Sequence, residues 1–140
     1  MEKPYFSFLF ILWQTFFLLA SACYVYSQSK QDSVNYHYES LLKIENNQRT
    51  LDAIAFFENE LEAKLKRKDS ANAAYYLELV SMGQLKIGQY FDSEKNAITA
   101  LKILDSLEEN TSNFSAKGRL LLSLGANYRD RFDYENEIKY

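Results

Sequence analysis

The stretch Tyr76–Asp92, with the sequence YLELVSMGQLKIGQYFD, decides how this chain folds. Its apolar side chains recur mostly at steps of three and four residues, the period of one buried helix face, at Tyr76, Leu77, Val80, Leu85 and Ile87. Gly88 stands where a helix ends in a left-handed residue, and Asp92 is a candidate N-cap for a second helix. The stretch therefore predicts two helices joined by a short turn.

The same pattern continues on both sides of this stretch, from about Val34 to the end of the chain. No Pro occurs there, and polar breaks fall at residues 45–48, 67–70, 88–90, 110–113 and 130–133. Asp69 or Ser70 is a candidate N-cap in the second break, and Ser115 is one after the fourth. The breaks divide the region into six helical segments of roughly 8 to 18 residues, grouped in pairs. We therefore expect an all-α fold.

Residues in two of the predicted helix pairs follow one pattern. In the earlier pair, the turn Lys86–Asp92 joins large residues of the first helix to small residues of the second, namely Leu77 and Val80, then Ser93, Ala97 and Ala100. The later pair has the corresponding residues Leu121, Leu124, Gly125 and Tyr128, followed by Asp133, Tyr134 and Ile138. Both patterns resemble the tetratricopeptide repeat (TPR) of exported, Bacteroidetes-like bacterial proteins. Over residues 34–140 the resemblance implies antiparallel helix pairs stacked as a short α-solenoid.

The chain departs from that repeat at several positions. Ser81 replaces the usual Gly and Gln84 the usual Tyr of the earlier unit, while Phe132 and Glu137 replace small residues of the later unit. The two registers lie 44 residues apart, instead of the usual spacing of about 34. Residues 35–44 and 51–57 form a third, weaker unit. An ordinary helical bundle is the alternative to a solenoid.

The solenoid interpretation makes two further predictions. Gly88 and Gly125 should mark places, one repeat apart, at which neighbouring helices touch almost backbone to backbone. The later repeat also stops early, because Tyr140 is only at about position 23 of 34. Terminal repeats normally carry a polar capping helix, whereas Ile138 and Tyr140 would face no neighbour. We therefore expect the helical region to be truncated at its C-terminal end.

An apolar segment precedes the helical region. No charged side chain lies between Lys3 and Lys30. The run Phe6–Ala20 has the length of a signal-peptide core, shorter than the ~20 residues that a membrane-spanning helix needs. Ala20-Ser21-Ala22 is an A-x-A cleavage pattern, and residues 26–28 offer a second candidate cleavage site. Residues 1–28 are therefore predicted to be a signal peptide or a membrane anchor, and the rest of the chain to be exported.

Two alternatives to cleavage remain open for this segment. Extended to Tyr26, the uncharged run is long enough for a membrane anchor that is retained. Ala20-Ser21-Ala22-Cys23 also resembles a bacterial lipoprotein box, in which the Cys is lipidated, although Ala20 stands where Leu is usual. All of these alternatives predict a periplasmic or membrane-associated protein that meets the membrane only through its N-terminal segment.

The composition excludes several classes of function. The 16 Lys and Arg residues against 19 Asp and Glu give a net charge of -3, which provides no basic surface for nucleic acid. One Cys, one His and four Gly leave no disulfide framework, zinc site or phosphate loop. His37 and the carboxylate pairs Glu58/Glu62 and Glu108/Glu109 are better explained as packed or solvated side chains than as general acids and bases. We expect no enzyme activity, catalytic residue, metal or cofactor.

Binding is better supported than catalysis. The resemblance implies that the first helices of the repeats line a concave groove that contacts a protein or peptide. In the earlier unit the groove positions are Tyr75, Glu78, Met82, Leu85 and Lys86, and in the later unit they are Arg119, Leu122, Ala126, Arg129 and Asp130. Aromatic, Met and Arg side chains are common in recognition surfaces, and Arg can hold a carboxylate by two parallel hydrogen bonds. Leu85 and Leu122 have a second interpretation, as core residues.

Two functions follow as hypotheses. The first is an exported scaffold or adaptor whose helical groove binds a peptide segment of a partner protein. The second is the N-terminal sensor region of a larger signal-transduction protein, with a histidine kinase or a helix-turn-helix transcriptional regulator farther along. The second hypothesis rests on a resemblance of architecture alone.

Overall fold

The computed structural model describes residues 5–43 and 47–131, with the backbone alone for residues 5–12. All regular secondary structure in these residues is α-helical, which confirms the expected all-α class. The five helices are α1 (Tyr5–Leu42), α2 (Asn47–Lys66), α3 (Ser70–Lys86), α4 (Tyr90–Asp105) and α5 (Thr111–Asp130). The chain divides into two compact units, Met1–Tyr36 and His37–Tyr140, and the boundary between them falls within α1.

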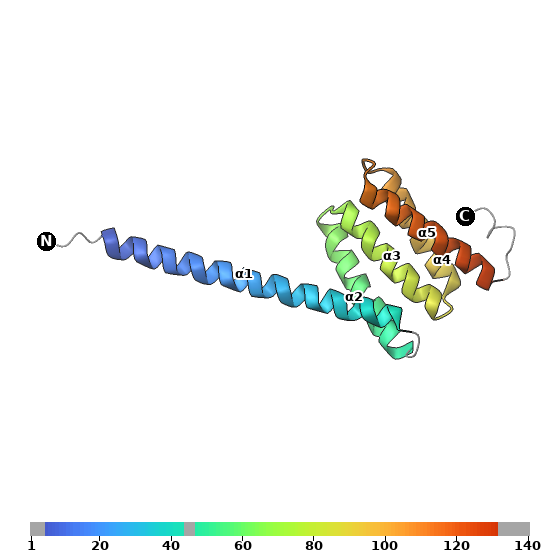
Figure 1. Ribbon diagram of the computed structural model, residues 1–140, viewed down its shortest axis with the longest axis horizontal. Helices are drawn as coiled ribbons and strands as arrows, with labels where there is room; N and C mark the ends of the chain where they lie inside the picture. Colours follow the sequence, from blue (N-terminus) through green and yellow to red (C-terminus); the bar gives the residue numbers. More distant parts are fainter. Residues whose placement is uncertain (1–4, 44–46, 132–140) are drawn as a thin grey trace. The chain divides into compact units, whose positions relative to one another are not determined.

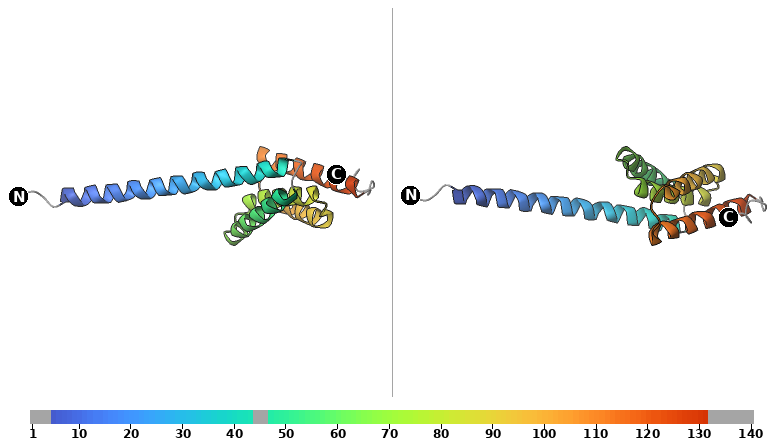
Figure 2. Two further views of the ribbon diagram at one scale, coloured as in Figure 1. Left: turned by 90° about the horizontal axis from the view of Figure 1, so that it is seen from below. Right: turned by 90° about the horizontal axis from the view of Figure 1, so that it is seen from above.

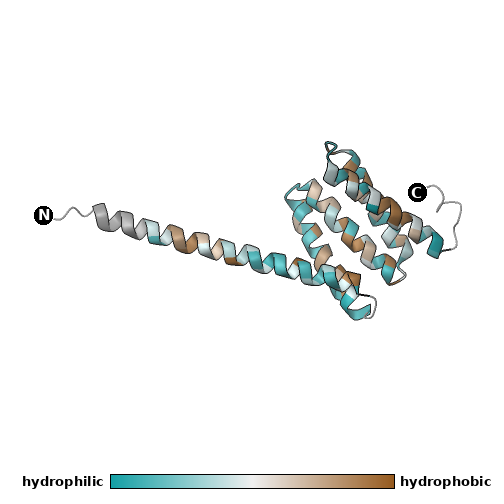
Figure 3. Ribbon diagram, in the orientation of Figure 1, coloured by the Kyte–Doolittle hydropathy of each residue, from teal (hydrophilic) through white to brown (hydrophobic). Residues whose placement is uncertain are grey.

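Helix α1 begins in the apolar segment and continues without a break to Leu42. The polar residues 29–33 do not interrupt it, because no Gly or Pro lies there and Gln28 donates a side-chain hydrogen bond to Asp32, four residues on. Figure 3 shows the apolar residues of α1 giving way to polar ones along its length. Within the part of the chain described, no helix has the length and hydropathy that a membrane crossing requires.

The second unit is built around α3, which packs against α2, α4 and α5 (Figure 1). Helix α5 in turn contacts both α3 and α4. Figure 2 shows α2 and α4 on one side of this group of helices and α5 on the opposite side. Consecutive helices thus pack in antiparallel pairs, as short connections between helices favour.

The closest contact between α3 and α4 is made by two small side chains. Ser81 is completely buried and Ser93 almost so. The Ser81 hydroxyl donates to the carbonyl oxygen of Ser93 at 2.9 Å, and the Ser93 hydroxyl donates to the carbonyl oxygen of Ser81 at 2.9 Å. A larger side chain at either position would push the two backbones apart. Ser81, at the place of the usual Gly, thus suits a close helix crossing.

The turns at both ends of α3 have the same geometry, in which a left-handed residue ends the preceding helix. Gly88 has φ of +78°, its N–H donates to Leu85 O, and the next N–H donates to Gln84 O. This is the Schellman arrangement, and it confirms the role expected for Gly88. Lys68, with φ of 56°, takes the same place after α2, with bonds to Leu65 O and Lys64 O.

The core between α3, α4 and α5 contains five residues of the predicted pattern, Leu77, Ala97, Ala100, Leu124 and Tyr128, and three that the sequence analysis did not name, Ala74, Leu104 and Leu120. Ala97 and Ala100 let α4 approach its neighbours, and Leu120 and Leu124 of α5 fill the space above them. The whole cluster is Ala74, Leu77, Ala97, Ala100, Leu104, Leu120, Leu124 and Tyr128. Each fully buried Leu side chain contributes on the order of 2 kcal/mol through removal from water.

A second core is aromatic and joins the end of α1 to α2 and α3. The His37 ring stacks on Phe56 with centroids 4.3 Å apart, and Phe57 packs edge-on to Phe56 at 5.3 Å. Phe57 also lies 6.0 Å from the Tyr76 ring. Burial lowers the pKa of His37 below its ordinary 6.5, because it disfavours the charged imidazolium, while Asp52 partly offsets this effect.

Several predicted boundaries were wrong. Asp69 caps α3, as expected, by accepting a bond from the Asn72 N–H. Asp92, however, lies in the first turn of α4, which begins after Gln89 without a side-chain cap. Ser115 lies inside α5, whose N-cap is Asn110, because Asn110 reaches the Asn113 N–H at 2.9 Å. Of the six expected segments, the first is the end of α1, and the sixth lies outside the described residues.

The expectation that helices touch closely at Gly88 was also wrong. A Cβ on Gly88 would meet nothing closer than the Tyr90 ring at 4.0 Å, so Gly88 serves the turn and not a close approach of helices. Gly125 lies within α5 and is half-buried, so its position is not equivalent. The glycine at a tight contact is Gly83, where a Cβ would lie 2.6 Å from Ile54 Cγ1 of α2. The predictions for Phe132, Asp133, Tyr134, Glu137, Ile138 and Tyr140 lie outside the described residues.

Lys68→Gly should raise the free energy of unfolding by about 1 kcal/mol, because it removes the strain of a side chain in the left-handed region. The matched variant Gly88→Ala should lower the free energy of unfolding by a similar amount, since its Cβ meets no steric obstacle and only the backbone conformation changes. Urea denaturation followed by circular dichroism measures both. A destabilised Lys68→Gly protein would contradict this account of the turn.

Ser81→Val should lower the free energy of unfolding by about 3 kcal/mol, since it overpacks the contact with α4 and leaves Ser93 without its partner. Ser81→Ala should cost only about 1 kcal/mol, because it removes the hydrogen bonds without adding bulk. The same denaturation experiment compares the two variants. Equal losses would show that close approach of the helices does not matter here.

Lowering the pH should destabilise the second unit through His37. The unfolded chain takes up a proton near pH 6.5, whereas the folded protein resists protonation until its lower pKa is reached. The His37 contribution is therefore complete above pH 6.5 and is lost as the pH falls through the folded pKa. Urea midpoints near pH 7.5 and near pH 5.5 measure this loss. His37→Gln should show a smaller difference between the two pH values, because no other His is present.

Candidate functional site

The predicted groove residues come from two helices that pack against each other, α3 and α5. From α3 come Tyr75, Glu78, Met82, Leu85 and Lys86, and from α5 come Arg119, Leu122, Ala126, Arg129 and Asp130. None of these side chains is fully buried. They lie on the sides of their helices that the core does not use, since the core takes Leu77, Leu120 and Leu124.

Glu78 and Arg119 form a two-point ion pair across the two helices. Arg119 Nε donates to Glu78 Oε1 at 2.5 Å, and Arg119 Nη2 donates to Glu78 Oε2 at 3.0 Å. The hydrogen bonds to Glu78 raise the pKa of Arg119, so the guanidinium carries its charge at all working pH values. This contact gives Arg119 a role in packing, because it joins α5 to α3.

Two tyrosines lie next to this ion pair. Tyr75 is partly exposed, and its ring lies 5.4 Å from that of Tyr76. Burial raises the pKa of Tyr75, with further contributions from Tyr38 and Glu78. Tyr38, at the end of α1, acts electrostatically on both Tyr75 and Arg119, and it is also partly exposed. The sequence analysis missed Tyr38, and only the weak third repeat unit pointed toward its helix.

Lys86 has a different environment from the one that a groove residue would have. Its ammonium group donates to the carbonyl oxygen of Leu41 at 2.9 Å and also to that of Lys43. Leu41 lies in the last turn of α1 and Lys43 follows it directly, at the helix end where a cation is favoured by the helix dipole. Lys86 therefore holds the end of α1 against α3, and its ammonium group is occupied by these hydrogen bonds within the protein. Met82 and Leu85, on the same helix, are half-buried.

The predicted groove residues on the outer part of α5 are open to solvent. Leu122 is 74% exposed, so it is not a core residue of the described structure. Arg129 is exposed as well, and its Nε lies 3.3 Å from a carboxylate oxygen of the neighbouring Asp130. Ala126 is half-buried between them in sequence. An exposed Leu beside an exposed Arg is a combination that can contact a partner.

A polar cluster at the other end of the α4–α5 contact was not predicted. Glu94 accepts from the Tyr128 hydroxyl at 2.5 Å and from Arg131 Nη1 at 2.6 Å. The Arg131 guanidinium also lies 4.3 Å from the centre of the Phe91 ring. Asn127, fully buried, donates to Tyr90 O at 2.8 Å. These contacts hold α5 against α4, and the charged groups of this cluster pair with each other.

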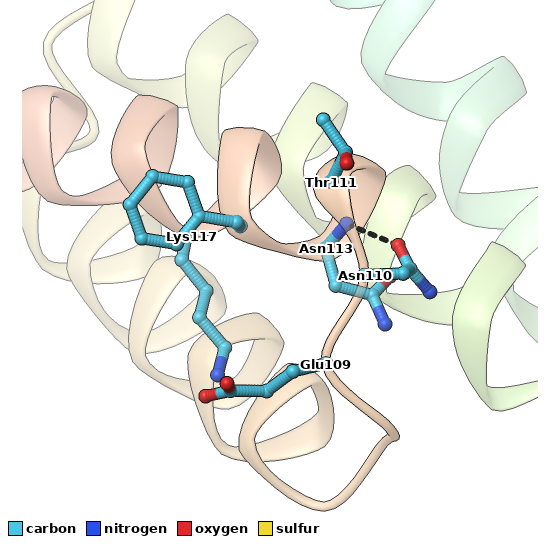
Figure 4. Close-up of a pocket in the computed structure, with 6 residues that line it drawn as sticks. Glu109, Asn110, Thr111, Asn113 and Lys117 are labelled. Carbon is cyan, nitrogen blue, oxygen red and sulfur yellow. Dashed lines mark hydrogen bonds between the residues drawn. The ribbon is translucent and has the colours of Figure 1, made fainter.

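A separate cavity of about 480 Å³ lies at the beginning of α5 (Figure 4). It is lined by Glu109, Asn110, Thr111, Asn113, Phe114 and Lys117. Several of its polar groups already serve the local structure, since Asn113 Nδ2 donates to Glu108 O and Lys117 pairs with Asp105 at 2.8 Å. The way the chain enters α5 therefore accounts for this cavity. In the described residues, no three His, Cys, Asp or Glu side chains gather as a metal site requires.

Comparison of the chain with protein-family models, with curated proteins and with solved structures finds no match.

Proposed function

We propose that this chain is an exported protein-binding scaffold of the tetratricopeptide-repeat type, whose groove is formed by α3 and α5. The single observation that carries the proposal is the face shared by these helices. It combines exposed aromatic and aliphatic side chains, Tyr75 and Leu122, with the guanidinium of Arg119. Surfaces of this composition bind protein segments, because they offer apolar area and directional hydrogen bonds together.

The packing of the helices supports the repeat assignment. The α3–α4 pair is joined by a short turn at Gly88, crosses closely at Ser81 and Ser93, and receives α5 against both of its helices. A helix that packs on both members of the preceding pair is what stacking of helix pairs requires. The buried small residues Ala97 and Ala100 lie where the repeat pattern asks for close packing.

The proposal of export rests on the N-terminal segment. The side chains of α1 that follow residue 12 include eight large apolar residues that are each at least 65% exposed, Trp13, Phe16, Phe17, Leu18, Leu19, Tyr24, Val25 and Tyr26. Such a surface is unfavourable in water, so a hydrophobic environment or removal of the segment is needed. Both outcomes agree with a signal peptide, a lipidated Cys23 or an anchor.

A photo-crosslinking amino acid at position 122 should capture a partner protein in the native host, because Leu122 lies on the proposed groove face. The same amino acid at position 95 is the matched control, since Lys95 is exposed on α4. Arg119→Gln should reduce capture from position 122 without changing helicity. The charge reversal Arg119→Glu is unsuitable, as it would place a second carboxylate against Glu78. Equal capture from positions 122 and 95 would contradict a specific groove.

The mass of the protein isolated from its native host tests export. We expect a chain that begins after residue 22 or after residue 28, or one that carries a lipid on Cys23, recovered outside the cytoplasm. A retained anchor would instead give the full mass in the membrane fraction. Recovery of the full-length chain from the cytoplasm alone would overturn the proposal of export.

A further inference from the structure

The two partners of the Glu78–Arg119 ion pair are unequally buried. The Glu78 side chain is only 13% exposed, whereas that of Arg119 is 55% exposed. The carboxylate is therefore set back against α3, and the pair presents its cationic side to solvent. An ion pair that served packing alone would gain nothing from this asymmetry, since the exposed part of the guanidinium is screened by water.

The geometry of the pair leaves a defined part of Arg119 available. A guanidinium has five N–H donors, and Glu78 takes one from Nε and one from Nη2. In the described part of the chain, no other hydrogen bond to Arg119 occurs. Three donors remain, two on Nη1 and one on Nη2, and one from each of these nitrogens forms the second edge of the guanidinium. That edge can donate two parallel hydrogen bonds to a carboxylate.

The surroundings of Arg119 add hydrogen-bonding groups and apolar area. The phenol groups of Tyr38 and Tyr75 lie within electrostatic reach of the guanidinium. Both phenols are partly exposed, and a phenol hydroxyl can donate to an anion. Of the two other cations of the predicted groove, Lys86 is held by Leu41 O and Lys43 O, and Arg129 contacts only the neighbouring Asp130 among the ion pairs of the described residues. Arg119 differs from both, because a carboxylate of another helix holds its guanidinium while free donors are directed away from that carboxylate.

We propose that Arg119 receives a carboxylate of the partner protein on its Nη1–Nη2 edge, next to Tyr38 and Tyr75, and that Glu78 is a positioning residue that fixes the guanidinium for this contact. Glu78, one of the predicted contact residues, would then act through Arg119 and not touch the partner. A fixed guanidinium loses less side-chain entropy on binding than a mobile one, so its hydrogen bonds contribute more to affinity. This inference rests on the proposed binding function.

The test uses the full chain, kept in solution with a non-ionic detergent, and a peptide library. The library consists of acetylated and amidated peptides of random sequence, in which one central position is fixed as Asp, Glu, Asn or Gln. A parallel library with free C-terminal carboxylates separates binding of a side chain from binding of a chain end. Fluorescence anisotropy of labelled pools measures the affinity, and circular dichroism checks the fold of each variant.

The acidic pools should bind about tenfold more tightly than their amide counterparts, as a charge-assisted pair of hydrogen bonds provides. Glu78→Gln should reduce this discrimination while leaving the affinity of the amide pools unchanged, whereas a loss of fold would weaken both. Arg119→Lys should abolish the discrimination, because Lys lacks the planar fork. Tyr38→Phe should weaken the acidic pools only. Lys95→Gln, at an exposed cation of α4 outside the predicted groove, is the matched control and should change nothing. Arg129→Gln should leave the discrimination unchanged.

The outcomes separate the inference from the function on which it rests. Equal binding of the acidic and amide pools would overturn the carboxylate site and leave a peptide-binding groove in place. Discrimination that is unchanged or increased in Glu78→Gln would show that Glu78 only competes for Arg119 and does not position it. Loss of the discrimination in Arg129→Gln would place the carboxylate site at Arg129 and overturn its assignment to Arg119. Absence of binding by every pool would overturn both the inference and the proposed function.

Discussion

The two hydroxyl groups of Ser81 and Ser93 determine how closely α3 and α4 can approach. Each hydroxyl satisfies its hydrogen-bonding capacity on the carbonyl oxygen of the other residue, so neither adds bulk or leaves a buried polar group without a partner. With the two backbones this close, the small side chains of Ala97 and Ala100 are sufficient to complete the contact. Any larger pair would separate the helices and open the core beneath α5.

The candidate binding face depends on this crossing, although it lies on the other side of α3. Because α5 packs against both α3 and α4, the angle and distance of that pair set where α5 lies. Only in this position can the guanidinium of Arg119 reach Glu78 with both of its hydrogen bonds. The face is therefore a product of the core packing, and its polar groups are positioned by residues that never contact a partner.

The sequence predicted local features well where one residue type has few conformational alternatives. Gly88 was expected in a left-handed turn because it lacks a Cβ, and the structure confirms this. The N-cap prediction at Ser115 failed for a different reason, since several polar residues near the start of α5 compete for the same free N–H groups. The prediction at Asp92 failed because α4 begins after Gln89, which makes no side-chain cap. Asn110 is the N-cap of α5, and Asn is among the residue types preferred at that position.

The sequence alone determined the helical class, the buried positions Tyr76, Leu77 and Val80 of α3 and the turn at Gly88, because these depend on residues within a few positions of one another. Only the tertiary structure decided which charges are available. Glu78 and Arg119 are separated by 41 residues, and Lys86 and Leu41 by 45. Whether such residues meet depends on how helices cross, which no local pattern encodes. For the same reason the sequence did not show that Lys86 donates hydrogen bonds to the end of α1, or that Tyr38 lies within electrostatic reach of Arg119.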